Sequence, residues 1–327
     1  MKRATRHALW VSLLVFTGIA SAAPFPTRDQ NPLLAGYGLP MPMPARLAAS
    51  DGWQFSADLN WSSSAISEST GAETLIVDAE TRELRLTAGH GFADRWSFQL
   101  QLPYRYTGAG NLDGFIDGWH DAFGLPNGAR SDFPPDRFRI AYARNGVIEL
   151  DMQSSVAGIA DVSADIGYQL WTDATSSLVA WLSVKLPTGD SYKLTGSGAA
   201  DAALVIAGER RFGDRWSAFG QLGVTYLGNG DLLTGQQRNV VWSGLAGVSV
   251  DIWRGLDFKM QFDAHSAVFD DTALDFLGEA VILSVGGAYR FESGWTLDAG
   301  VSEDIVVDAS PDVVFVVGLR KALGSRR

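Results

Sequence analysis

The chain has 327 residues, of which 46% are hydrophobic, and it has no cysteine and a formal net charge of −11 at pH 7. The lack of cysteine excludes disulfides and thiolate metal sites. The acidic balance argues against nucleic acid as a partner. A chain of this length must therefore be held together by backbone pairing and burial.

The first residues predict a secretory signal peptide over 1–23. Met1, Lys2, Arg3 and Arg6 give a basic start, an apolar run follows over 8–20, and small residues occupy 20–23. This order is typical of a cleaved leader, with cleavage expected after Ala22 or Ala23. The apolar run is too short for the alternative, a retained membrane-spanning helix, and no later segment has about 18 consecutive apolar residues.

Residues 24–52 form a segment with six prolines and the apolar side chains of Leu33, Leu34, Tyr37 and Leu39. Because proline cannot donate to a strand ladder, the segment is not expected to be a wall strand. Two interpretations remain, a flexible tail or a plug inside a barrel lumen, and the apolar content favours the plug.

From residue 53 to 320 the sequence alternates between apolar and polar residues with a period of two. Short turns alternate with longer connections, as in outer-membrane barrels with short periplasmic turns and long outer loops. Trp96 and Tyr106 share a face, as do Trp216 and Tyr226. Ten residues of a tilted strand climb about 25 Å, which matches the distance between two aromatic girdles.

The opposite face carries charges of both signs, which a sandwich core would not bury but a polar lumen accepts. The sequence therefore predicts an all-β fold, a transmembrane antiparallel β-barrel of the bacterial outer membrane. We expect lipid contact for Phe98, Leu100, Leu204, Phe258, Phe262 and Phe315, with Phe258 near mid-bilayer. We expect the lumen to contain Asp58, Arg105, Asp161, Asp165, Lys185, Asp201, Lys259, Asp263 and His265.

The count is fourteen strands over 53–320, followed by a tail at 321–327. The strands at 137–153 are the least regular, and if they form a hairpin outside the wall the count is twelve. The apolar residues of 73–91 change phase, which predicts a bulge within 78–83. Lys185 to Asp190 predicts a strand exit and turn, because Pro187 and Gly189 suit that role.

The connection 107–136 contains GFIDGWHDAFGLPNGAR at 114–130, which has more apolar weight than an ordinary solvated loop. It is interpreted as a folded lid over the outer mouth. Its candidate ligand-binding or lid residues are Asp113, Asp117, Trp119, His120, Asp121 and Arg130. The simpler interpretation, that these groups hydrogen-bond the loop to itself, is favoured. No metal site is expected, because no HxH or HxxxH spacing occurs.

Asp263 and His265 point into the lumen together, with Asp304 expected at a similar height. An Asp–His pair is a weak candidate for the base and orienter of a lipid-modifying hydrolase. Ser266 is a poor nucleophile for His265, because adjacent strand residues point to opposite faces. A polar lumen network is the favoured interpretation.

Five stretches resemble a family of bacterial outer-membrane proteins catalogued as domain of unknown function 3187. They are NPLLAGYGLP at 31–40, GFIDGWHDAFGLPNGAR at 114–130, KLPTGDSYKLTGSGAADAAL at 185–204, QFDAH at 261–265 and EDIVVDASPDVVF at 303–315. The family brings no established activity. The LPTGD piece is also similar to barrels known as outer-membrane transporters for aromatic-compound pathways.

The leading hypothesis is a channel or transporter that binds a small, partly hydrophobic molecule and is gated by the N-terminal plug and the lid. The alternatives are the lipid-modifying hydrolase and a structural or adhesive barrel without ligand. Expected partners are outer-membrane lipid, the barrel-assembly machinery and a small molecule. No cofactor is expected.

Overall fold

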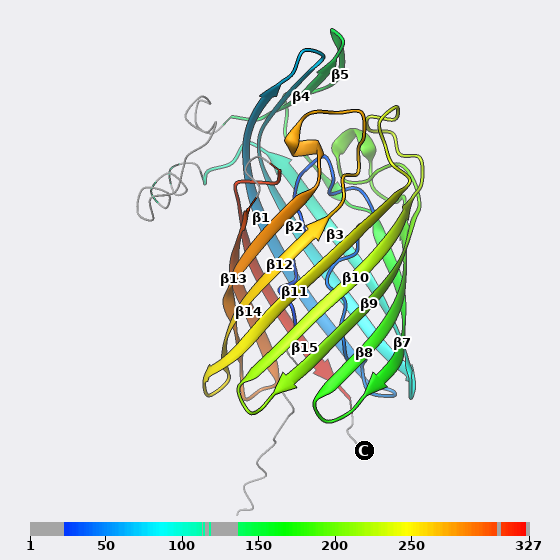
Figure 1. Cartoon of the computed structure of the whole chain (residues 1–327), viewed down its shortest axis with the longest axis vertical. Helices are drawn as coiled ribbons and strands as arrows, with labels where there is room; N and C mark the ends of the chain where they lie inside the picture. Colours follow the sequence, from blue (N-terminus) through cyan, green and yellow to red (C-terminus); the bar gives the residue numbers. More distant parts are fainter. Residues whose placement is uncertain (1–22, 113, 115–117, 119–136, 306–308, 325–327) are drawn as a thin grey trace, which may run out of the picture.

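The computed structural model describes residues 23–112, 114, 118, 137–305 and 309–324. In this part of the chain, twelve long antiparallel strands form a closed ring, and three shorter ones lie at its outer end (Figure 1). The ring strands are β1 (Trp53–Ser69), β2 (Glu73–Ala93), β3 (Trp96–Gly108), β7 (Val162–Thr172), β8 (Ser176–Leu186), β9 (Asp201–Phe212), β10 (Trp216–Leu227), β11 (Val240–Trp253), β12 (Leu256–His265), β13 (Ala280–Arg290), β14 (Trp295–Asp304) and β15 (Val313–Leu323). The shorter strands are β4 (Arg139–Arg144), β5 (Val147–Met152) and β6 (Val156–Ile159), and two 3-10 helices, η2 (Ser191–Lys193) and η3 (Asp275–Leu277), lie in outer connections.

The ring closes where β1 pairs with β15, from Trp53 opposite Leu323 to Ser63 opposite Val313. The pairings β1–β2 and β2–β3 continue the ring on the other side. In hydrocarbon, an unpaired backbone group costs several kcal/mol, so closure removes the edges that an open sheet would expose. No helix in the described residues is long and apolar enough to span a membrane.

The count of fourteen wall strands is wrong, and the alternative of twelve is correct. β4 and β5 form a hairpin whose first strand pairs with Glu73–Asp78 of β2. That part of β2 extends beyond the rim, as Figure 1 shows at the top of the barrel. The hairpin therefore lengthens the sheet outside the wall, because both neighbours of β2 within the ring are already β1 and β3.

The bulge expected within 78–83 does not occur. The β1–β2 register runs without a shift from Thr74 opposite Ser69 to His90 opposite Trp53. Leu75 and Val77 are fully buried, on the same inward face as Glu83 and Arg85. The change from charged to apolar residues marks the point where the inside of the barrel changes from a polar lumen to an apolar outer cap.

The last strand also differs from expectation, because β15 continues to Leu323 rather than ending at 320. Leu323 pairs with Trp53 and so completes the seam at the end of the short turns. Gly213, Gly255 and Gly294 lie in three of these turns with φ of +60°, +83° and +83°. This left-handed conformation favours glycine and allows tight reversal between adjacent strands.

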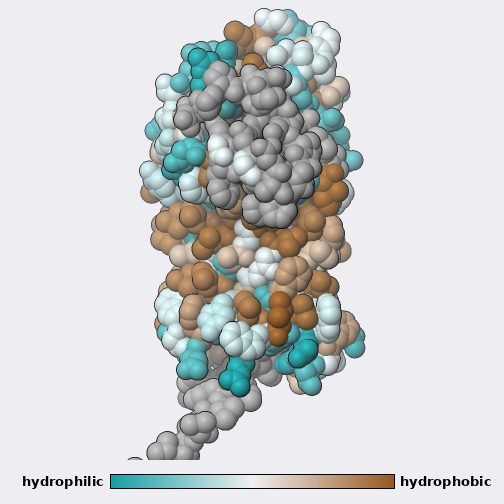
Figure 2. Space-filling model, turned by 90° about the vertical axis from the view of Figure 1, so that its left-hand side faces the viewer, coloured by the Kyte–Doolittle hydropathy of each residue, from teal (hydrophilic) through white to brown (hydrophobic). Residues whose placement is uncertain are grey.

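An apolar belt crosses the face of the barrel seen in Figure 2, and exposed large hydrophobic side chains occur on all twelve ring strands. Leu100, Leu204, Phe258 and Phe262 of the predicted lipid face are 40–60% exposed, and Phe98 and Phe315 are half-buried. At the end with the short turns, Trp53, Trp96, Trp171, Trp216 and Trp253 are exposed, and Tyr104, Tyr226 and Trp242 are exposed toward the other end. A belt of this kind is typical of strands that face lipid.

The predicted depth of Phe258 is wrong. Phe258 is two residues from Leu256, where β12 leaves its short turn, so it lies toward the periplasmic side of the belt. Phe262 lies farther along the same strand and closer to its centre.

Candidate functional site

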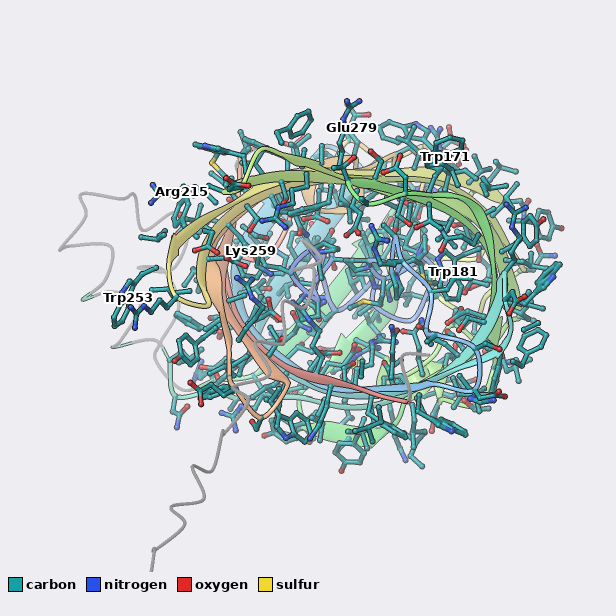
Figure 3. The ribbon with its side chains drawn as sticks, turned by 90° about the horizontal axis from the view of Figure 1, so that it is seen from below. Trp171, Trp181, Arg215, Trp253, Lys259 and Glu279 are labelled. Carbon is teal, nitrogen blue, oxygen red and sulfur yellow. The ribbon has the colours of Figure 1, made fainter. Side chains whose placement is uncertain are left out.

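The N-terminal segment from Ala23 to Leu47 lies inside the barrel, as the view along the barrel shows (Figure 3). Trp181 and Lys259 point toward it, whereas Trp171 and Trp253 project from the outside of the wall. The segment rises from the level of Lys259, turns near the outer end, and returns to the short-turn end before β1. We call this segment the plug, as a name for its position.

The rising part of the plug is held by side chains of the wall. Lys259 donates to the carbonyl of Ala23, pairs with Asp298, and lies 4.0 Å from the centroid of the Phe25 ring. The backbone amide of Phe25 donates to Gln261 Oε1 at 2.8 Å. The wall thus satisfies backbone groups that the plug, lacking a strand ladder, would otherwise leave unpaired.

Higher in the lumen, Asp29 of the plug binds His265 of β12. His265 Nε2 lies 2.9 Å from Asp29 Oδ2, and the backbone amide of Asn31 donates to Asp29 Oδ1 at 2.8 Å. His265 Nδ1 is 3.0 Å from the carbonyl of Ser266. Both ring nitrogens therefore have partners, and neither is a hydroxyl.

The stretch KLPTGDSYKLTGSGAAD builds a lysine-centred node around the turn of the plug. Lys185 Nζ lies 2.6 Å from Asp161 and 3.0 Å from Asp201, and it donates to the carbonyl of Gly36 at 2.9 Å. Asp201 also accepts from the backbone amide of Gly38 at 2.7 Å. The ammonium of Lys185 and the carboxylate of Asp201 thus hold the plug by its backbone, and Asp161 pairs with the same ammonium.

The glycines of the plug turn allow this close approach. A Cβ at Gly36 would lie 2.8 Å from the backbone carbon of Gly196, and one at Gly38 would lie 2.6 Å from Cβ of Asp201. Contacts under 3.0 Å do not occur at real Cβ atoms without movement of a neighbour. The GYG sequence at 36–38 is therefore required by the packing of plug against wall.

Arginines of the wall and the plug meet beside this node. Glu83 accepts from Arg85 at 2.5 Å and from Arg105 at 2.5 Å. Arg105 also donates to the carbonyls of Ala35 and Leu194. Arg28 of the plug donates to the carbonyls of Ala35, Tyr37 and Leu39.

The returning part of the plug is bound by a side-chain amide that both accepts from and donates to its backbone. Gln221 accepts from the amide of Met43 at 2.7 Å and donates to the carbonyl of Met41 at 3.2 Å. Trp181 donates to the carbonyl of Pro44 at 2.9 Å. Near the short turns, Arg46 pairs with Glu209 at 2.9 Å.

An apolar cluster caps the plug at the outer end. Leu33, Leu34 and Tyr37 of the plug pack there against side chains from β2, β4 and the outer connections. The partners include Leu75, Val77, Ile140, Leu233, Val268, Phe269, Phe276 and Leu277. This cluster explains the apolar content of the Pro-rich segment.

Above this cluster, hydrogen bonds to Glu73 hold β4 and two of the outer loops together. Tyr142 Oη donates to Glu73 at 2.6 Å, and Gln236, Thr272 and the amide of Ala273 also donate to it. Burial raises the pKa of Glu73, but these hydrogen bonds favour the carboxylate and together lower the pKa below its ordinary value.

We therefore predict that the outer cap loosens in acid. A carboxyl group whose pKa is lowered in the folded state stabilises that state above its unfolded pKa, and the contribution is lost as pH falls through the folded value. Hydrogen exchange of residues 270–277 should accelerate, relative to the barrel strands, below the ordinary titration range of glutamate. Glu73→Gln should exchange faster at neutral pH and show a weaker pH dependence. Equal pH profiles for the variant and the parent would contradict this role of Glu73.

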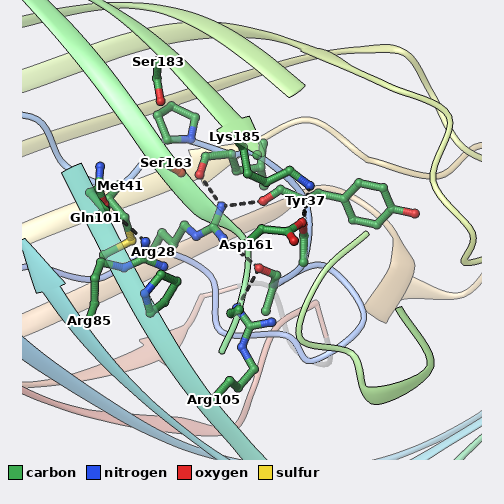
Figure 4. A pocket seen from close by; sticks show the side chains of 17 residues that line it. Arg28, Tyr37, Met41, Arg85, Gln101, Arg105, Asp161, Ser163, Ser183 and Lys185 are labelled. Carbon is green, nitrogen blue, oxygen red and sulfur yellow. Dashed lines mark hydrogen bonds and ion pairs between the residues drawn. The ribbon is translucent and has the colours of Figure 1, made fainter. Parts of the chain in front are cut away.

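Two small cavities lie between plug and wall in the described part of the chain. Each has a volume of about 30 Å³, which exceeds the roughly 10–15 Å³ that one ordered water molecule needs. The first lies beside Arg28, Arg85, Arg105 and Lys185 (Figure 4), and the second lies beside Asp29 and His265.

The structure gives a position to each lumen residue selected from the sequence. All nine are buried inside the barrel: Asp58, Arg105, Asp161, Asp165, Lys185, Asp201, Lys259, Asp263 and His265. Five of them, Arg105, Lys185, Asp201, Lys259 and His265, contact the plug. The lid candidates Asp113, Asp117, Trp119, His120, Asp121 and Arg130 lie outside the described residues, so the lid stays a prediction.

The proposed hydrolase residues do not form a catalytic arrangement. Asp263 accepts from Gln261 at 2.8 Å, whereas His265 is bound by Asp29 and Ser266. Asp304 lies two strands away, opposite Ile282. Among the described residues, no group of three or more His, Asp or Glu side chains is arranged to hold a metal ion.

Sequence reasoning misses Glu83, Arg28 and Asp29, which are charged residues inside the barrel. Glu83 is missed because a bulge within 78–83 would leave open which face of the strand it occupies. Without the bulge it lies on the inner face, as does Arg85 two positions on. Arg28 and Asp29 lie in the plug, where no periodic pattern marks which side chain will meet the wall.

Comparisons with known proteins agree with this architecture. The structure is similar to an outer-membrane channel from Pseudomonas putida F1, with a TM-score of 0.57, 15% sequence identity, and coverage of 86% of this chain and 98% of that one. It is also similar to the NanC porin, with a TM-score of 0.45, 10% identity, and coverage of 84% and 100%. No curated protein sequence matches the chain. The model of the family described as Protein of unknown function (DUF3187) matches residues 8–323, and the chain therefore belongs to that family.

Proposed function

We propose that the protein is an outer-membrane channel or transporter for a small molecule, closed in this state by its plug. The observation that carries the proposal is the way in which the plug is held. Wall side chains bind its backbone groups at Phe25, Gly36, Gly38 and Met43, and the plug adds no strand to the ring. The plug can therefore move without breaking any ladder of the barrel.

The inner wall supports the same proposal. If the plug moves, the wall that it leaves presents charged and amide side chains of β2, β3, β8, β9, β10 and β12 to water. Such side chains are solvated at low cost, so an aqueous path replaces the plug. The fold of the Pseudomonas putida channel, which covers 86% of this chain, fits this function.

The test weakens one anchor of the plug in the full-length protein. Lys185→Met removes the donor to Gly36 and leaves Asp161 and Asp201 buried without their cation. Breaking a buried ion pair in this way costs about 3–5 kcal/mol. We expect frequent openings in planar lipid bilayers, where the parent protein stays mostly closed.

Lys193→Met is the matched control, because Lys193 is exposed and pairs only loosely with Asp190 at 3.7 Å. It should conduct like the parent protein. The heat-modifiable migration of each variant in gels would verify that the barrel is intact. A folded Lys185→Met variant that stays as closed as the parent would refute a plug-gated channel.

A further inference from the structure

The first cavity lies against three guanidinium groups, two of which pair with the same carboxylate. Arg28, Arg85 and Arg105 line it, and the ion pairs of this group among the described residues are those with Glu83. Lys185, which also lines the cavity, is different because Asp161 and Asp201 both pair with it. Positive charge therefore exceeds negative charge on the arginine side.

Two other carboxylates that interact with Arg85 have hydrogen-bond partners of their own. Asp58 lies opposite Arg85 in the β1–β2 ladder, but it accepts from Ser56 at 2.7 Å. Asp165 accepts from Gln99 at 3.0 Å and from Gln101 at 2.8 Å. Both carboxylates also attract Arg85 electrostatically, but the ion pairs of the three guanidinium groups are with Glu83, so the guanidinium groups outnumber the carboxylate that they pair with.

Arg85 has an unused donor beside the cavity. It is 5% exposed, and its Nε has no hydrogen-bond partner. Its Nη atoms donate to Glu83 and to Gln101. Buried polar groups are nearly always paired, and an unpaired N–H of a charged group carries a large desolvation cost.

Carbonyl oxygens of the plug accept hydrogen bonds from two of these guanidinium groups. The carbonyl of Ala35 accepts from Arg28 at 3.0 Å and from Arg105 at 2.8 Å, and those of Tyr37 and Leu39 accept from Arg28. A carbonyl carries only a partial charge. A carboxylate would form shorter and stronger bonds with the same donors, and guanidinium matches its planar, two-oxygen geometry.

We propose that Arg28, Arg85 and Arg105 bind the carboxylate group of a small organic anion, and that this anion competes with the plug carbonyl of Ala35 for Arg105. The apolar side chains of Leu39, Pro40 and Pro103 line the same cavity and suit a hydrophobic remainder. The inference rests on the proposed function and names its substrate class. Binding thereby releases one anchor of the plug, so the substrate itself favours opening.

The absence of cysteine from the chain allows a direct test with a single reporter. Ala45→Cys places a thiol on the returning part of the plug, beside Trp181 and 9% exposed. Its reaction rate with a membrane-impermeant maleimide measures plug movement in full-length protein. We expect benzoate to raise the rate several-fold and saturably, and benzamide, which has the same shape without the charge, to leave it unchanged.

Two charge variants in the Ala45→Cys background complete the design. Arg85→Gln should weaken the apparent affinity for benzoate by at least about tenfold, because it removes a charge-assisted donor. Arg215→Gln, in an exposed turn outside the lumen (Figure 3), should respond like the parent. An equal response to benzamide, or an unaltered benzoate response in Arg85→Gln, would overturn the carboxylate site.

The outcomes for this site and for the channel are separable. No benzoate response, together with frequent openings of Lys185→Met, would overturn the carboxylate site and leave the gated channel standing. If Ala45→Cys without ligand reacts as fast as Ala174→Cys, whose position in a short turn is exposed, the closed plug itself is refuted.

Discussion

Deletion of residues 24–47 is expected to convert the closed barrel into a permanently open pore. The ring is complete without these residues, because β1 pairs with both β2 and β15. Residues 48–52 are retained because Gly52 donates to the carbonyl of Ala49 and Asp51 to that of Gly91, which fixes the start of β1. Barrels of about eight strands are filled by their own side chains and those of sixteen hold an aqueous channel, so twelve strands emptied of a plug should conduct.

The measurement is single-channel conductance in planar bilayers at fixed salt. Because the plug occupies the lumen and the two cavities beside it measure about 30 Å³ each, we expect an increase of at least about tenfold. The control is deletion of 145–146 at the tip of the β4–β5 hairpin, which shortens an outer element that does not line the lumen. If the plug deletion folds but conducts no better than the parent, the ring alone does not enclose a path.

Phe262→Arg is expected to destabilise the barrel by about 2–4 kcal/mol, the cost of an arginine at the bilayer midplane on a lipid-facing position. Phe262 is 42% exposed on the outer face of β12, between Gln261 and Asp263, which are buried in the lumen. Its place in the middle of the apolar belt leaves the guanidinium far from water on either side.

The measurement is reversible urea unfolding from lipid vesicles, followed by tryptophan fluorescence. Leu323→Arg is the matched control, because Leu323 is 47% exposed at the end of β15 beside the short turns. There the cost should fall to about 0–1 kcal/mol. Equal losses for the two variants would mean that the middle of β12 does not lie at the centre of the bilayer.

The barrel wall is predictable because its signal is local and repeated. A strand with one face toward lipid and the other toward a polar lumen alternates at every residue, so Leu100 and Gln101 are assigned to opposite faces without knowledge of their neighbours. The same local signal fails where the inside is apolar. It assigns Leu75 and Val77 to the outside, because the outer cap is built from distant residues and cannot be inferred from β2 alone.

The contacts of the plug cannot be predicted from the sequence for a different reason. Asp29 binds His265, which is 236 positions away in sequence, and the backbone around Arg28 and Asp29 follows no repeating geometry. The alternation of apolar and polar residues identifies the charged residues of the wall. It does not show that so many of them are present because they bind the plug. From the sequence, Lys185 is a lumen residue at a strand exit, and only the fold shows that it binds the carbonyl of Gly36.

The position of the plug in the chain restricts the order of assembly. The segment immediately precedes β1, and β1 forms the closing seam with β15, the last strand, about 260 residues farther along. Pairing over such a separation forms slowly, because the entropy of loop closure is lost before the contact is gained. The plug contacts β3, β8, β9, β10 and β12. The strands from β8 to β12 each pair with the next strand in sequence, over short separations. A plug that binds this partly curved sheet would hold β1 close to β15 and shorten the search for the seam, so the segment that closes the pore would also act as an internal template for folding.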